Sequence, residues 1–159
     1  MIKFKERKPL RRAAGSVLVE TALVLMTLVT LLAFLTLLGR YFWYYNVAQK
    51  AAFDGARFLA TATQVEMRTL KSGAREPVVA ALARQIVLEE LADIEPYLSM
   101  VSVDVHCDFR TCTNSVPLTV RVSISLSMQD DVFRFFTSKL TLQEGMPILA
   151  DVTVNYAGK

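Results

Sequence analysis

The chain has 159 residues, enough for one compact domain and a further segment, and 53% of them are hydrophobic, which is high for a soluble domain of this size. The formal net charge is +3, but six Lys and Arg residues and one Glu precede Gly15, so the remainder is near −2. A nucleic-acid-binding surface requires clustered Lys and Arg, and the sequence has no such cluster after Arg12. Composition therefore argues against a nucleic-acid partner.

One long apolar segment follows the basic head. Residues 16–39 number 24 and carry a single charge, at Glu20. As a helix they would span roughly 36 Å at about 1.5 Å per residue, enough for the ~30 Å hydrocarbon core of a bilayer. A cation and aromatic residues follow at 40–45, as is typical of a membrane–water interface. The basic head predicts a cytoplasmic N-terminus, with everything after Tyr45 outside the cytoplasm.

The order of the small and apolar residues differs from that of an ordinary secretory signal. In such a signal, the small-residue cleavage site follows an apolar stretch of about 7–15 residues. Here the small residues, at 13–15, precede the apolar segment, so cleavage would occur on the cytoplasmic side of the span.

Glu20 is the fifth residue after Gly15, and a carboxylate in lipid is costly. One interpretation is that Glu20 snorkels to the interface. The other is that it binds a cation. Cleavage after Gly15 would create one, the new α-amino group of Ser16 on this or a neighbouring subunit, and the two charges would attract strongly at low dielectric.

Two sequence segments resemble a known family. They are a V-E-x-A-L-V-L core at 19–25 and, after the aromatic exit, an N-A-x-x-A-A-x-x-G-A-R-like segment at 46–57. Over roughly residues 11 to 62 the chain resembles the TadE/TadF-like minor pseudopilins of the tight-adherence (Tad) pilus system, with a type IV prepilin-like signal. The resemblance implies that prepilin peptidase cleaves the chain, with Gly15, Ser16 and Glu20 as cleavage and recognition residues. It also implies that other pilins and pseudopilins contact the N-terminal helix.

A helix is expected to continue over residues 46–63, which lack Pro. Small residues recur on one face of it, because positions four apart lie together: Ala48, Ala52, Gly55, Ala56 and Ala60. Small residues let two backbones approach closely. This face packs either beneath the chain's own domain or against another subunit's helix. Phe53, Phe58 and Leu59 are expected to flank it and to supply buried area.

The remaining sequence predicts an α+β domain. A polar break at 69–75 is followed by a helix that starts at Glu76–Pro77 and ends near Pro96, with a solvated face that includes Arg84. Its apolar residues follow helical spacing and are expected in the core: Val79, Leu82, Ala83, Ile86, Val87, Leu91, Ile94 and Leu98. Alternating patterns at 101–107, 116–128 and 148–156 predict three antiparallel strands. An apolar segment at 130–140 is expected to lie on the sheet edge as a short helix or loop. A helix on such a sheet forms two layers, and by analogy the long N-terminal helix makes the fold pilin-like.

Two cysteines, Cys107 and Cys112, frame the loop between the first two strands. Outside the cytoplasm they are expected to form a disulfide. His106, the one histidine, is expected on the solvated face of a strand, where Asp108 does not complete a metal site. No catalytic residue, metal, cofactor or small-molecule substrate is predicted.

The leading hypothesis is a non-enzymatic minor pseudopilin of the bacterial inner membrane, with lipid and other pilins as partners. It divides the chain into a leader at 1–15, a transmembrane helix at 16–39, an extracytoplasmic helix extension and linker at 40–73, and a periplasmic domain at 74–159. TadE-like and TadF-like membership remain alternatives. The competing hypothesis is an uncleaved, signal-anchored periplasmic binding or scaffold module, which would keep its basic leader.

Overall fold

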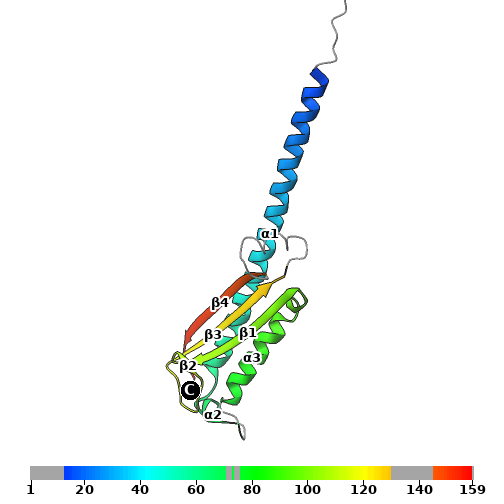
Figure 1. Ribbon diagram of the computed structural model, residues 1–159. Helices are drawn as coiled ribbons and strands as arrows, with labels where there is room; N and C mark the ends of the chain where they lie inside the picture. Colours follow the sequence, from blue (N-terminus) through cyan, green and yellow to red (C-terminus); the bar gives the residue numbers. More distant parts are fainter. Residues whose placement is uncertain (1–12, 71–72, 74–75, 130–144, 159) are drawn as a thin grey trace, which may run out of the picture. The chain divides into compact units, whose positions relative to one another are not determined.

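The computed structural model describes residues 13–70, 73, 76–129 and 145–158 (Figure 1). The chain divides into two compact units, Met1–Gly39 and Arg40–Lys159. Helix α1, Ala13–Thr61, contributes to both units and is 49 residues long. The segment expected at 130–140 lies outside the described residues.

In the first unit, the described part of α1 is mainly apolar and carries one charge, at Glu20. Its large hydrophobic side chains from Val17 to Leu35 are exposed. The hydroxyl groups of its threonines hydrogen-bond to carbonyl oxygens three or four residues earlier, over 2.8–3.0 Å, so these polar atoms need no water. Among the described residues, one helix is long and apolar enough to cross a membrane, at Gly15–Thr61. It fits a single-pass membrane anchor.

The second unit has two layers. A sheet with strand order β2-β1-β3-β4 is antiparallel throughout, and α1 and α3 pack on one face of it (Figure 1). The bounds of the elements after α1 are α2 Gln64–Arg68, α3 Val78–Leu91, a 3-10 turn η1 Glu95–Tyr97, β1 Leu98–Cys107, β2 Arg110–Thr111, β3 Thr119–Met128 and β4 Met146–Asn155. The predicted α+β class is confirmed, with four strands in place of three because the cysteine loop itself forms β2.

Buried and more exposed residues alternate along the strands, and the buried ones form the inner face of the sheet, which the helices cover. Every second residue of β3 from Val120 to Met128 is buried, as are Ile148 and Ala150 of β4. The predicted phase fails at the start of this pattern, where Leu118 is 82% exposed. Its backbone N–H donates to the Asp108 carboxylate, 2.9 Å to Oδ1, so Leu118 precedes the strand and does not follow its pleat.

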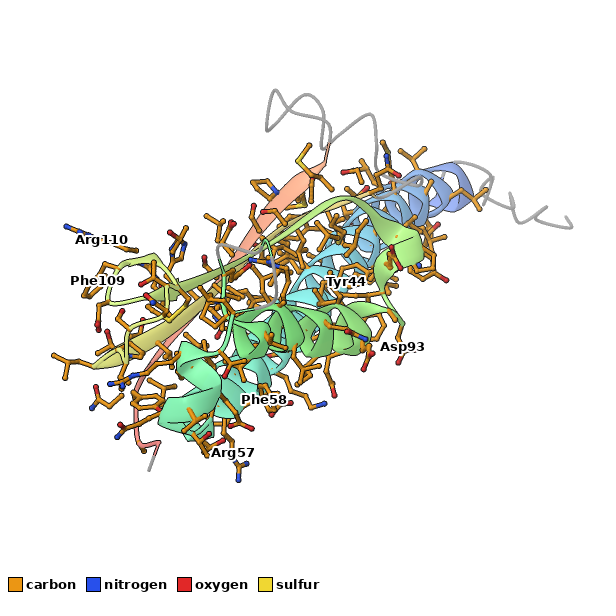
Figure 2. All side chains as sticks on the ribbon, turned by 90° about the horizontal axis from the view of Figure 1, so that it is seen from below. Tyr44, Arg57, Phe58, Asp93, Phe109 and Arg110 are labelled. Atoms are coloured by element: carbon orange, nitrogen blue, oxygen red, sulfur yellow. A yellow bond between two sulfur atoms is a disulfide. The ribbon has the colours of Figure 1, made fainter. Side chains whose placement is uncertain are left out.

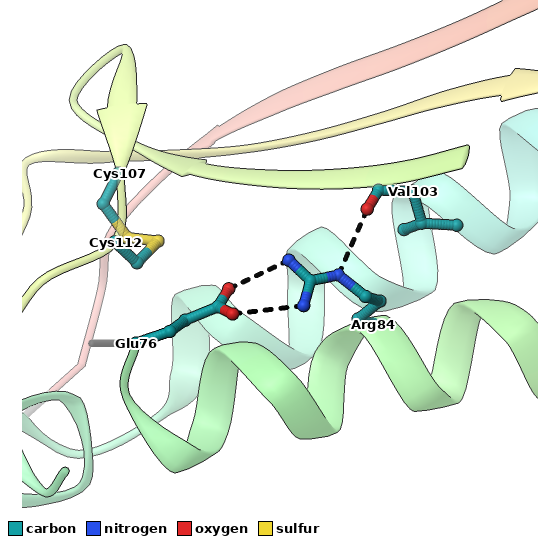
Figure 3. A network of polar contacts seen from close by, with 5 residues as sticks. All are labelled: Glu76, Arg84, Val103, Cys107 and Cys112. Atoms are coloured by element: carbon teal, nitrogen blue, oxygen red, sulfur yellow. Dashed lines mark hydrogen bonds and ion pairs between the residues drawn. A yellow bond between two sulfur atoms is a disulfide. The ribbon is translucent and has the colours of Figure 1, made fainter. Parts of the chain in front are cut away.

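Helix α3 begins at Val78, with Pro77 as its extended N-cap residue. Two predictions for its faces are wrong. Leu82, expected in the core, is exposed, and Arg84, expected in solvent, is partly buried. Figure 3 shows the reason for Arg84: its guanidinium donates two 3.1 Å hydrogen bonds to Glu76 and a third to the carbonyl oxygen of Val103 in β1. Position 84 therefore borders the sheet. Leu98, expected on the helical stripe, is instead the first residue of β1.

The C-terminal residues donate hydrogen bonds to carbonyl groups at the end of α1. The N–H of Ala157 donates to the carbonyl oxygen of Ala60 over 3.0 Å, and the Tyr156 hydroxyl donates to that of Ala62 over 2.7 Å. These bonds pair carbonyl groups that a helix end otherwise leaves without partners. Burial beside them raises the pKa of Tyr156. The last strand is thereby fixed to the end of the first helix.

Candidate functional site

The three residues predicted for cleavage and recognition lie in the first turns of α1. Gly15, Ser16 and Glu20 are helical and exposed. Ser16 and Glu20 are four residues apart and therefore share one face of the helix. Among the residues that the structure describes, Glu20 has no ion-pair partner. Its side chain is exposed on the surface of the helix.

Packing within the described chain does not require glycine at position 15. A Cβ atom added there meets nothing within 4 Å, and its φ is not positive. Glycine inside a helix costs about 1 kcal/mol relative to alanine. Nothing in the described part of the chain compensates that cost.

The small-residue face of α1 is covered by the chain's own domain. Ala48, Ala52, Ala56 and Ala60 are buried. A Cβ atom added to Gly55 would lie 2.5 Å from Cγ2 of Val87 in α3 and 3.8 Å from Cγ1 of Val122 in β3. The small-residue face was expected to pack either beneath the chain's own domain or against another subunit. At Gly55 the structure shows packing beneath the chain's own domain. Phe53, expected to be buried beside it, is instead 50% exposed, whereas Leu59 is buried.

An ion pair joins the two helices at the edge of this packing. The Lys50 ammonium group lies 2.6 Å from Oε2 of Glu90 and 3.9 Å from Oδ2 of Asp54. The hydrogen bond to Glu90, followed by the attraction of that charge, raises the pKa of Lys50. The pair is exposed to solvent, so its contribution to stability is small. The pair links α1 to α3 at the protein surface.

The cysteine loop is fixed at two points. Cys107 and Cys112 form the predicted disulfide, with Cα atoms 4.7 Å apart. Asp108 accepts hydrogen bonds from the N–H groups of Leu118 and Thr119, at 2.8–3.1 Å. Asp108 and Phe109 have positive φ angles of 50° and 64°, a conformation that costs a non-glycine residue energy. Phe109 and Arg110 point outward at the tip of this loop (Figure 2).

Opening the disulfide should lower the stability of the domain. We expect Cys107→Ala with Cys112→Ala to reduce the free energy of unfolding by about 2 kcal/mol, because the short ring no longer restricts the unfolded chain. Urea denaturation of the protein in detergent, followed by circular dichroism, measures the change. Reduction of the unsubstituted protein is the matched control and should have a similar effect. Equal unfolding midpoints with and without reductant would contradict the prediction.

His106 does not lie in solvent as expected. It is half-buried, and its Nδ1 atom is buried without a hydrogen-bond partner in the described part of the chain. The cause is its position in the sheet, because it is paired with Thr111 of β2 on one side and Arg121 of β3 on the other. Within the described ranges, no three His, Cys, Asp or Glu side chains are arranged to hold a metal ion.

Comparison with known proteins finds a family match over much of α1. Residues 15–57 match the family described as TadE-like protein. The match begins at Gly15 and ends at Arg57, so it includes the candidate cleavage residues and most of the small-residue face. No curated protein and no solved structure matches the chain. The family resemblance predicted from the sequence is confirmed over these residues.

Proposed function

Because residues 15–57 carry the TadE-like family segment, we propose that this protein is a minor pseudopilin of a Tad pilus, cleaved after Gly15 by prepilin peptidase. Proteins of this family are structural components of the pilus, associated with its other subunits. In this proposal the chain crosses the bacterial inner membrane once, with its N-terminus in the cytoplasm and its second unit in the periplasm.

The observation that carries the proposal is the start of the family match at Gly15. That glycine has open space around it, and it lies between the basic head and the apolar segment. A peptidase that acts at the cytoplasmic surface of the membrane would meet the backbone there without a side chain in the way. The position and the missing side chain together favour Gly15 as the residue before the cut.

Cleavage would also give Glu20 a partner. The new α-amino group of Ser16 is positive at neutral pH, and Glu20 is exposed one helical turn away without an ion-pair partner among the described residues. In a bundle of such helices, the carboxylate of one subunit can bind the amino group of the next. Attraction between the two charges is strong where water is excluded, so the pair would favour one axial position for an incoming subunit.

The intact mass of the protein extracted from membranes tests the proposal. We expect a loss that corresponds to residues 1–15, with Ser16 as the new N-terminus. Cells that lack prepilin peptidase provide the control and should retain the full-length mass. Retention of the leader in cells with an active peptidase would instead support the uncleaved, signal-anchored binding or scaffold module, because such a protein keeps its basic head as a topology signal.

A further inference from the structure

The outer face of the sheet lies opposite the helices, and its side chains change from partly apolar to polar along the strands. Its side chains lie in rows across β1, β3 and β4. The first row is Met100, Ser127 and Pro147, and the second is Ser102, Ser125 and Leu149. Met100 and Leu149 are each 72% exposed. We call Met100, Pro147 and Leu149 the proximal patch.

Beyond these two rows the outer face is polar. The third row is Asp104, Ser123 and Asp151, and the fourth is His106, Arg121 and Thr153. Arg121 forms a bidentate ion pair with Asp151, with both distances 2.7 Å. Exposed large apolar side chains on the described outer face are therefore confined to one end of the sheet.

That end is next to the aromatic segment that follows the apolar span. The hydroxyl of Tyr41 makes a long hydrogen bond, 3.5 Å, to the carbonyl oxygen of Pro147, which belongs to the proximal patch. Phe42 and Trp43 follow Tyr41 in α1 and are more than half exposed. Aromatic residues at this point of a span mark the headgroup level of a bilayer. The patch is thus continuous with the proposed membrane exit.

We propose that the proximal patch lies in the headgroup region of the bilayer that α1 spans, with phospholipid as its partner. Alternate residues of a strand are about 6.6–6.8 Å apart, and interfacial elements bury their apolar side chains roughly 5–10 Å into the headgroup boundary. The two rows that carry the patch fit that depth. The third row, with its two aspartates, begins where the boundary ends. The second unit is thereby held against the membrane by its sheet before assembly.

This inference rests on the proposed membrane anchoring, and quenching of tryptophan fluorescence can separate the two. The full chain with Trp43→Phe receives one tryptophan at a time and is placed in vesicles of phosphatidylethanolamine and phosphatidylglycerol that contain dibrominated phosphatidylcholine. Leu32→Trp, in the apolar span, reports whether the chain is inserted. Leu149→Trp reports on the proximal patch, and Leu118→Trp on an exposed leucine at the other end of the sheet.

We expect Leu149→Trp to be quenched about twofold or more relative to Leu118→Trp, and to emit at shorter wavelength, because only the patch reaches the interfacial layer of roughly 5–10 Å. Leu88→Trp provides a second control, since Leu88 is exposed near the end of α3 that leads to β1. It should resemble Leu118→Trp.

Strong quenching of Leu32→Trp together with weak quenching of Leu149→Trp would overturn the inference and leave the anchor intact. Equal quenching of Leu149→Trp and Leu88→Trp would also overturn it, because the whole end of the unit, and not the patch, would then meet lipid. Weak quenching of Leu32→Trp would show that the proposed anchoring itself is wrong.

Discussion

Gly15→Leu is expected to abolish removal of the leader and to leave the folded domain unchanged. A Cβ atom added at this position has no neighbour within 4 Å, and leucine is a better helix former than glycine, so we expect the described chain to fold as before. A peptidase that binds the backbone at Gly15 would be blocked by the added side chain. Intact mass of the membrane-extracted protein should then show the full-length chain.

Gly39→Leu is the matched control for this experiment. Gly39 also lies in α1 and also has nothing within 4 Å of an added Cβ atom, but it lies 24 positions further along the chain. The same change of residue in the same helix should leave cleavage intact. If Gly15→Leu is cleaved as efficiently as Gly39→Leu, glycine is not the recognition feature.

Gly55→Leu is expected to destabilise the second unit by about 3 kcal/mol or more, because overpacking a well-filled core costs about 1–3 kcal/mol and sometimes exceeds it. Even the first added carbon would lie 2.5 Å from Cγ2 of Val87, and Val87 is fully buried. Such a loss is a large share of the roughly 5–15 kcal/mol that stabilises a typical domain. Thermal unfolding in detergent, followed by circular dichroism, should show a much lower midpoint than that of Gly39→Leu.

A double-mutant cycle tests whether the clash with Val87 is the cause. Gly55→Ala alone adds the clashing carbon, and Val87→Ala alone removes the methyl groups that it meets. If the two side chains compete for one space, the double variant should be more stable than the sum of the single losses predicts, with a coupling of roughly 0.5–3 kcal/mol. Additive losses would mean that Gly55 is required for a different reason.

The sequence was sufficient to predict the parts of the fold that depend on periodicity. The apolar run from residue 16 to 39, the alternation in β3 and β4, and the disulfide all follow from local composition and spacing. Leu118 and Arg84 were mispredicted because each continues a local pattern that a distant group overrides. Leu118 is turned out of the strand by the Asp108 carboxylate, and Arg84 is held against β1 by Glu76 and the Val103 carbonyl.

The candidate site was predicted in a different way. Gly15, Ser16 and Glu20 are proposed from their order relative to the charged and apolar segments and from the family resemblance, and their role stays a prediction. The sequence cannot decide whether the small-residue face packs against the chain's own domain or against another subunit, because both kinds of packing need the same spacing of small residues. Only the three-dimensional structure distinguishes them. The loop that Cys107 and Cys112 frame is predicted from the sequence. The hydrogen bonds that Asp108 accepts from Leu118 and Thr119 are not, because those residues are ten and eleven positions away.

The covered face of α1 also determines where a soluble fragment can begin. Gly55 of that helix lies close to Val87 of α3 and Val122 of β3, although the sequence predicts a domain that starts at residue 74. A fragment that starts at 74 would expose Val87 and Val122 to water and leave the C-terminal bonds of Tyr156 and Ala157 without acceptors. A fragment that starts near Arg40, where the second compact unit begins, retains the helix that the sheet is folded around.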